Sequence, residues 1–332
     1  MRLDGIRQSL VRGVLARAVA TGRVAHAYLF AGEPGLGQEE AARSVIAALL
    51  CAEPDPGGAC GRCPACRKIE AGNHPDVLWV APEGATFKTD QVATVVRELR
   101  YRPVEGRLRC AVLAGADTMT MEAANRLLKT LEEPPGDALL ILLAADESRL
   151  PETIRSRCQR VVFRPLAIQD LARELMDGGP SGGAGERRAH WLARLARGNP
   201  ERARALAEHP QLDAIRDTVR DGLERVGQGD PLAALETAEQ WSSWDAADVD
   251  LALDIGEASL VEAWLQGGAI GSARAAAAGA EMPQDRLART WRDVEPEAVL
   301  AAFARARWRL AARVGVQNVL DALFLELQAA RA

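Results

Sequence analysis

The 332-residue sequence has no apolar run that approaches the roughly 20 residues needed for a membrane-spanning helix. Its N-terminus also lacks the apolar core of a secretory signal peptide. These two absences predict a cytoplasmic protein without a membrane partner.

The sequence also lacks an excess of positive charge and is poor in aromatic residues. A net charge of −5 gives the chain no overall attraction for nucleic acid, so a DNA contact is expected to be local or to belong to a partner. The tryptophans of the C-terminal part are more often core or interface residues than a stacking platform for bases. They are Trp241, Trp244, Trp264, Trp291 and Trp308.

The stretch 32–39, Gly-Glu-Pro-Gly-Leu-Gly-Gln-Glu, has the glycine spacing of a phosphate-binding loop without its functional side chains. In a Walker A loop, G-x-x-x-x-G-K-[ST], the lysine reaches the β- and γ-phosphates and the hydroxyl holds Mg²⁺. Gln38 occupies the lysine position and Glu39, a carboxylate that would repel the triphosphate, occupies the hydroxyl position. We therefore expect a loop that keeps its shape without binding ATP. Its glycines are Gly32, Gly35 and Gly37.

Four closely spaced cysteines predict a structural zinc site, because thiolates in the pattern C-x8-C-x2-C-x2-C can surround one tetrahedral metal. A catalytic zinc would keep one position open for water. Free thiols or a redox pair remain the alternative, and disulfides fit a cytosolic chain less well. The nearby His74 is expected to be a loop residue rather than a ligand. The cysteines are Cys51, Cys60, Cys63 and Cys66.

Short apolar runs alternate with helical patterns over the first half of the chain, which predicts a doubly wound parallel sheet. Its ligand crevice would lie at the carboxyl ends of the strands, where the glycine loop sits. The expected strands are 27–31, 77–80, 108–114, 138–144 and 161–163. The expected helices are 3–22, 38–50, 89–101, 123–133 and 151–157.

After residue 165 only helical periodicity is present, with helices expected at 168–176, 186–197 and 201–208. The helical pattern then continues from 212 to the end of the sequence. The expected fold class is therefore α/β followed by all-α.

Four motifs in this order resemble the bacterial clamp-loader branch of the AAA+ proteins, and within it the delta-prime type of DNA polymerase III subunit. The resemblance is carried by motifs to about residue 205, and beyond that by length and helical character. The matching stretches are 26–30 before the glycine loop, the four cysteines, 123–135 with the sequence AANRLLKTLEEPP, and 150–159 with LPETIRSRCQ.

The resemblance implies an AAA+ nucleotide-binding-like domain at 1–165 with a zinc-binding insertion at 51–66. A small helical lid domain would follow at 166–210, and a helical collar that joins subunits at 211–332. The implied partners are the tau/gamma ATPase subunits and the delta subunit of the clamp loader. Contact with the sliding clamp and primed DNA would come through the assembled complex.

The resemblance also implies a role for Arg157, which lies between Ser156 and Cys158 in a motif whose arginine enters a neighbouring subunit's ATP site. A guanidinium suits this arginine-finger role because it is permanently charged and makes a planar fork of hydrogen bonds to phosphate oxygens. The alternative is that Arg157 forms only a surface ion pair.

Other parts of an active ATP site are missing as well. Ala114 and Gly115 stand where an active member carries the acidic Walker B pair, and no polar sensor side chain is found at 144–145. Asp117 lies two residues further on and is as easily a helix cap. Glu201 stands where active members place a sensor 2 arginine.

These losses favour a non-hydrolysing delta-prime subunit that has no ATPase activity of its own within the DNA polymerase III holoenzyme, a DNA-directed DNA polymerase. The first alternative is an active tau/gamma-type clamp-loader ATPase. The second is an independent zinc-dependent nucleic-acid-binding module. The acidic net charge and the lack of a basic, aromatic-interleaved stretch near the cysteines stand against this second alternative.

Overall fold

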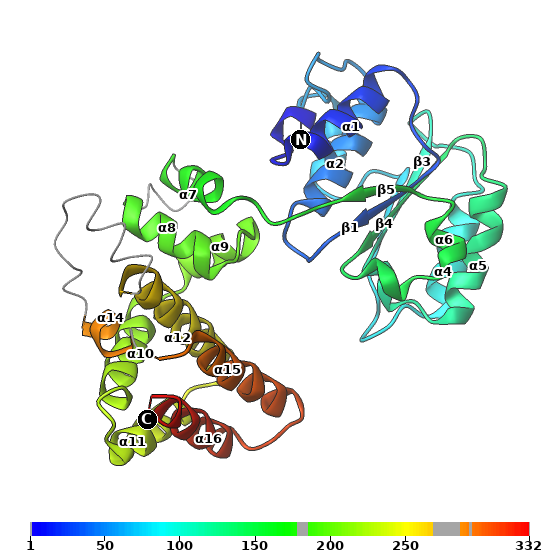
Figure 1. The fold of residues 1–332 in the computed structure, drawn as a ribbon. Coiled ribbons are helices and arrows are strands. Elements are labelled where there is room, and N and C mark those ends of the chain that lie inside the picture. The colour runs from blue at the N-terminus through cyan, green and yellow to red at the C-terminus, as the bar shows by residue number, and fades with distance from the viewer. Residues whose placement is uncertain (1, 178–184, 268–285, 292–293, 332) are drawn as a thin grey trace. The chain divides into compact units, whose positions relative to one another are not determined.

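The protein is described by a computed structural model that covers residues 2–177, 185–267, 286–291 and 294–331 (Figure 1). It divides into two compact units: Met1–Asp177 with Arg197–Ala203, and Gly178–Ala196 with Arg204–Ala332. The finer division into domains at 1–165, 166–210 and 211–332 stays a prediction.

The first unit is built on a five-stranded sheet in the order β2-β3-β4-β1-β5. Every strand pair is parallel, so the expected doubly wound α/β sheet is confirmed. The strands are β1 (Ala27–Ala31), β2 (Val77–Val80), β3 (Arg109–Ala114), β4 (Ala138–Ala144) and β5 (Gln159–Val162).

Helices cover both faces of this sheet, as an all-parallel sheet requires (Figure 1). Successive strand residues point to opposite faces, so Phe30 and Ile141 join one buried cluster while Leu29 and Leu142 join the other. On the first face lie α1 (Ser9–Ala20), α2 (Gln38–Leu50) and α3 (Pro64–Glu70). On the second lie α4 (Thr89–Glu98), α5 (Met121–Glu132) and α6 (Glu152–Arg155).

The single entry helix expected at 3–22 is wrong, because the chain forms a 3₁₀ turn, η1 (Leu3–Gly5), before α1 begins. The backbone amide of Leu3 donates to the carbonyl of Gly57 at 3.0 Å. This hydrogen bond holds η1 beside the cysteine segment, the stretch between α2 and β2. The buried face of α1 holds Val11, whereas Leu10 is 84% exposed. The 3₁₀ turn and the residues after it interrupt the helical pattern, so residues 3–22 do not form one continuous helix.

After β5 the described residues form helices joined by loops, and none of them belongs to a strand, which confirms the all-α character expected there. Trp241 and Trp291 are fully buried in the second unit, whereas Trp308 is 72% exposed. None of the helices formed by the described residues is long and apolar enough to cross a membrane. The helices are α7 (Ile168–Met176), α8 (Glu186–Leu195), α9 (Pro200–Glu208), α10 (Leu212–Val226), α11 (Pro231–Ser242), α12 (Ala246–Gly267), α14 (Arg286–Trp291), α15 (Pro296–Ala311) and α16 (Val316–Ala329).

Candidate functional site

The glycine loop joins the carboxyl end of β1 to the first turn of α2, as the strand, loop and helix pattern predicts. The amide of Gly32 donates to the carbonyl of Ala144 at the end of β4, which fixes the start of the loop to the sheet. Gly37 precedes α2 with a φ of +100°, a left-handed conformation that favours glycine. The loop thus lies between the carboxyl end of a parallel strand and the N-terminus of a helix, which is the place of a phosphate-binding loop in such folds.

The side chain of Gln38 folds back into this loop instead of extending from it. Its Nε2 atom donates to the carbonyls of Gly32 and Glu33, both at 2.8 Å, and the residue is 6% exposed. The amide therefore connects the first turn of α2 to the start of the loop. A neutral amide held by two loop carbonyls offers no positive charge to a phosphate, while Glu39 is exposed beside it.

A second side chain, Asn199, closes the loop from outside. Its Nδ2 atom donates to the carbonyl of Pro34 at 2.8 Å, and its Oδ1 atom accepts from the amides of Glu201 and Arg202 at 3.1 Å each. Asn199 therefore caps α9 and attaches the start of that helix to the loop. A Cβ on Gly35, which has a φ of +87°, would lie 2.7 Å from the Oδ1 atom of Asn199.

From the sequence, 198–200 was expected to end the preceding helix and to begin the segment that resembles sensor 2, and no role was assigned to Asn199 itself. An Asn-Pro pair directly before a helix is an N-cap signature, and that signal was available. The partner of its amide, Pro34, lies 165 residues earlier, and no local pattern indicates such a pairing.

Asp117 is the carboxylate nearest to the Walker B positions, and its oxygens are bound by backbone amides. They accept from Ala145 at 3.1 Å and Asp146 at 3.3 Å, and the residue is 7% exposed. The alternative of Asp117 as a helix cap is wrong, because Thr120 accepts from the Ala123 amide and caps α5. Asp117 braces the loops that follow β3 and β4.

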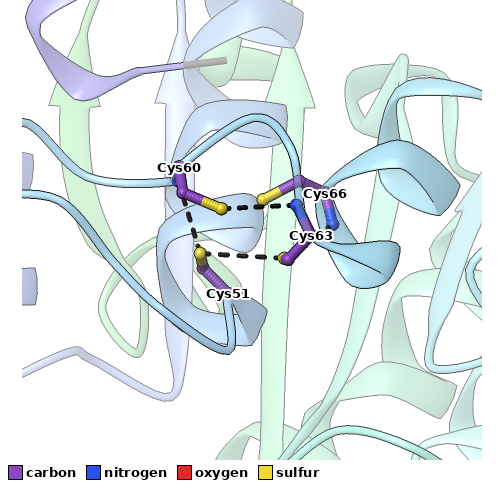
Figure 2. Close-up of side chains that lie close together, drawn as sticks. All are labelled: Cys51, Cys60, Cys63 and Cys66. Carbon is purple, nitrogen blue, oxygen red and sulfur yellow. Dashed lines mark hydrogen bonds between the residues drawn. The ribbon is translucent and has the colours of Figure 1, made fainter.

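The four cysteines gather into one cluster after α2 and around the start of α3, with all four sulfurs within 4.8 Å of one another (Figure 2). The amide of Cys60 donates to the sulfur of Cys51 at 3.3 Å, and the amide of Cys66 donates to the sulfur of Cys63 at 3.5 Å. None of the four forms a disulfide. Such amide donors stabilise thiolates.

The acidity of these thiols varies across the cluster. Burial raises the pKa of Cys66 to about 12. Burial also opposes ionisation of Cys63, but amide donors from Cys66 and Ala52 outweigh it and lower the pKa of Cys63 to about 6. Four converging sulfurs are the donor set of a tetrahedral structural metal site, so these residues fit a metal such as zinc.

His74 lies outside this cluster, as the sequence interpretation expected. It is 3% exposed, and its Nδ1 atom accepts from the amide of Asp76 at 3.1 Å. The ring is therefore a part of the turn that leads into β2.

Arg157 follows α6 and lies at the edge where α5 and α6 meet. Its Nη2 atom is 2.7 Å from Oε1 of Glu132, and its Nη1 atom donates to the carbonyl of Thr153 at 2.9 Å. Its side chain is 37% exposed. Arg157 therefore contacts residues of α5 and α6 rather than the glycine loop.

The two neighbours of Arg157 in the motif have different environments. Ser156 is exposed, and its Oγ atom is 3.4 Å from Nη1 of Arg157. Cys158 packs against the apolar cluster beneath α4 and α5, and burial raises the pKa of its thiol to about 12. Cys158 is therefore a neutral packing residue rather than a nucleophile.

Comparison with known proteins identifies the family. The family model described as "DNA polymerase III, delta subunit" matches residues 7–167, a range that contains the glycine loop, the cysteine cluster and Arg157. The delta-prime subunit of Bacillus subtilis is 39% identical over 168 residues, which are 49% of this chain and 50% of that protein. The delta-prime subunit of Pseudomonas aeruginosa is 38% identical over 226 residues, which are 66% of each chain.

The matches thus span half to about two thirds of the length of these relatives. The tau subunit of Salmonella typhimurium is also similar, with 32% identity over 172 residues, but those residues are 27% of that protein. The description of the family model names a delta-type subunit of DNA polymerase III, and the two relatives with higher identity are delta-prime subunits. The chain belongs to the family of DNA polymerase III delta-prime subunits.

Proposed function

We propose that this chain is a non-hydrolysing delta-prime subunit of a cytoplasmic clamp loader that helps to place a sliding clamp on primed DNA. Its partners would be the tau/gamma ATPase subunits and the delta subunit, and the assembled complex would contact clamp and DNA. The observation that carries the proposal is Gln38, whose amide is bound to the carbonyls of Gly32 and Glu33 where an active site needs a cation.

Hydrolysis requires a cation on the phosphates, a hydroxyl ligand for Mg²⁺ and acidic residues that hold the metal. At the corresponding positions this chain has Gln38, Glu39, Ala114 and Gly115. The carboxylate that follows these positions most closely in the sequence is Asp117, and it already accepts hydrogen bonds from two backbone amides. The residues at these positions and the contacts of Asp117 support a structural role for the loop without hydrolysis of ATP.

In this proposal Arg157 acts in trans, as an arginine finger in the ATP site of the adjacent subunit. A guanidinium stays charged at any physiological pH and offers five N–H donors in a rigid plane. Its position on the outer edge of α5 and α6, more than a third exposed, supports access to a neighbour's phosphates. An arginine finger is worth about 10³- to 10⁵-fold in the rate of the site that it serves.

The test is the substitution Arg157→Ala in a loader reconstituted with its tau/gamma and delta partners. We expect assembly to be intact and the DNA-stimulated ATPase rate to fall. Arg155→Ala is the matched control, because Arg155 is an exposed arginine two residues away. An unchanged rate for Arg157→Ala would remove the finger role.

The similarity to tau subunits favours a second candidate, an active tau/gamma-type ATPase. The two candidates differ in what the isolated chain does with ATP-Mg²⁺. Saturable micromolar binding with turnover would support the second candidate and contradict the first.

We also propose that the four cysteines hold one structural Zn²⁺. Zinc would supply a rigid crosslink between the end of α2 and the start of α3, because it binds four thiolates and has no open coordination position in such sites. The supporting observation is the convergence of the four sulfurs, together with amide donors to three of them.

A further inference from the structure

We propose that Glu132 is a positioning residue for Arg157, an inference that rests on the proposed role of Arg157 as an arginine finger. Glu132 is the last residue of α5, and its Oε1 atom lies 2.7 Å from Nη2 of Arg157. The carbonyl of Thr153 on α6 accepts from Nη1 at 2.9 Å. Two elements thus hold the two terminal nitrogens of one guanidinium.

This arrangement fixes the plane of the guanidinium while leaving donors free. Of its five N–H groups, one on Nη2 is taken by Glu132 and one on Nη1 by Thr153. Nη1 also has a second, longer contact of 3.4 Å with the Oγ atom of Ser156. Among the described residues the Nε–H group and the second hydrogen of Nη2 have no hydrogen-bond partner, so they are left to meet phosphate oxygens. An arginine side chain has many rotamers, so holding it beforehand reduces the entropy that is lost when it engages a partner's site.

The position of Glu132 in its helix supports a specific role. The carbonyl dipoles at a helix C-terminus carry partial negative charge, so a carboxylate there is unfavourable without a cation. The guanidinium of Arg157 supplies that cation. The chain then leaves the helix at Glu133, because the residue before Pro134 is biased to extended conformations.

Glu133 provides an internal comparison. It carries the same charge one residue later and is exposed, and in the part of the chain that the structure describes its side chain has no polar partner. A general effect of negative charge near Arg157 would be shared by both glutamates. A positioning effect belongs to Glu132 alone.

The pair is also exposed enough to be tested without unfolding the protein. The side chain of Glu132 is 51% exposed and that of Arg157 is 37% exposed. Exposed pairs contribute little to folding stability. Loss of Glu132 should therefore change the orientation of Arg157 much more than it changes the fold.

The experiment measures kcat and KM for ATP of the reconstituted, DNA-stimulated loader that contains each variant. We expect Glu132→Ala to lower kcat roughly two- to fivefold, the factor that corresponds to the range for exposed ion pairs, with KM unchanged. Glu132→Gln, which keeps an acceptor oxygen, should lie between Glu132→Ala and wild type. Glu133→Ala should match wild type.

The double variant Glu132→Ala with Arg157→Ala separates positioning from an independent effect. If Glu132 acts only through Arg157, the double variant is as slow as Arg157→Ala alone. The positioning role is overturned if the fold-reductions in kcat of the two single variants multiply in the double variant. It is also overturned if Glu132→Ala has the wild-type rate or a higher one. In both cases the proposed arginine-finger role of Arg157 is unaffected. If Arg157→Ala itself has the wild-type rate, the proposed finger function fails instead.

Discussion

The side chain of Gln38 binds to its own loop instead of extending away from it. A lysine at this position would carry a charge toward a phosphate, whereas the glutamine amide can bind neutral carbonyls of its own loop. Its two hydrogen bonds at 2.8 Å reach Gly32 and Glu33, which begin the loop. The start of the loop is thus held by hydrogen bonds within the chain.

We therefore expect Gln38→Ala to lower the free energy of unfolding by about 1 to 3 kcal/mol, because two part-buried hydrogen bonds to loop carbonyls are lost. Chemical denaturation of the purified chain measures this change. Glu39→Gln is the control, since Glu39 is exposed and its change should stay within about 0.5 kcal/mol. Equal stability of Gln38→Ala and wild type would contradict a structural role for the amide.

Asp76 is a second residue whose role depends on distant backbone groups. Its carboxylate accepts from the amides of Val104, Glu105 and Gly106 at 2.6, 2.8 and 2.7 Å. Burial opposes its ionisation, but these three amide donors outweigh burial and lower the pKa of Asp76 below its ordinary value. The carboxylate holds the segment that leads into β3 beside the turn that leads into β2.

The direction of this pKa shift predicts an acid dependence of stability. A carboxyl with a lowered folded pKa contributes stability that is fully present above its unfolded pKa of about 3.9 and is lost as the pH falls through its folded pKa. We expect Asp76→Asn to cost about 2 to 3 kcal/mol at pH 7.

The cost of Asp76→Asn should shrink progressively when urea denaturation is repeated from about pH 4 downward. The carboxyl of the unfolded chain takes up a proton first, and the folded carboxyl with its lowered pKa takes one up only at a lower pH. Asp137→Asn, which changes an exposed carboxylate, serves as the control. A cost for Asp76→Asn that is the same at pH 7 and at the lower pH values would show that ionisation of Asp76 does not contribute.

At the scale of elements, the cysteine segment is a short excursion between α2 and β2 with a single helix, α3, of seven residues. Lys68 of α3 contacts Glu105 at 2.6 Å, but its side chain is 39% exposed, so this pair is a weak anchor. So small a segment cannot bury a core of its own. The segment is held by packing of Cys66 and Ile69 in the buried cluster of the first unit, and the proposed metal would add a crosslink to this packing.

Metal analysis of the purified chain should give about one zinc per chain, and a strong chelator should lower its melting temperature, because binding free energy at such a site is folding free energy. Cys66→Ser should lose the metal. Cys158→Ala should keep it, since Cys158 lies outside the cluster. Four free thiols without metal would contradict the zinc site.

The order of the elements was largely predictable from the sequence. The strand runs at 27–31 and 138–144 coincide with β1 and β4, because buried parallel strands are nearly continuous aliphatic runs. The predicted helix at 123–133 misses its true start at Met121 and α3 was not predicted, since short helices are defined by caps rather than by periodicity. Thr120 caps the start of α5. Cys63, a proposed zinc ligand, is the N-cap residue of α3.

At the scale of the whole molecule, the proposed role has two parts. The glycine loop at 32–39 would not hydrolyse ATP, and Arg157 would act in the ATP site of another subunit. Such a subunit would respond to ATP only through its neighbours. We expect the isolated chain to show no specific ATPase activity and no saturable binding of ATP-Mg²⁺ at micromolar concentration, as measured by calorimetry and phosphate release. A tau/gamma subunit assayed in parallel is the positive control, and turnover by the isolated chain would contradict the proposal.

The sequence by itself determined which residues stand at the spacing of a Walker A loop, because its glycines, lysine and hydroxyl residue have fixed spacings that can be compared directly. It also determined that four sulfurs could converge, since they lie close together along the chain. Only the tertiary structure decided where side chains find their partners. Asn199 reaches back 165 residues to Pro34, and Arg157 reaches back 25 residues to Glu132. Packing of the helices against the sheet and the caps of helix ends bring such pairs together, and no local spacing encodes them.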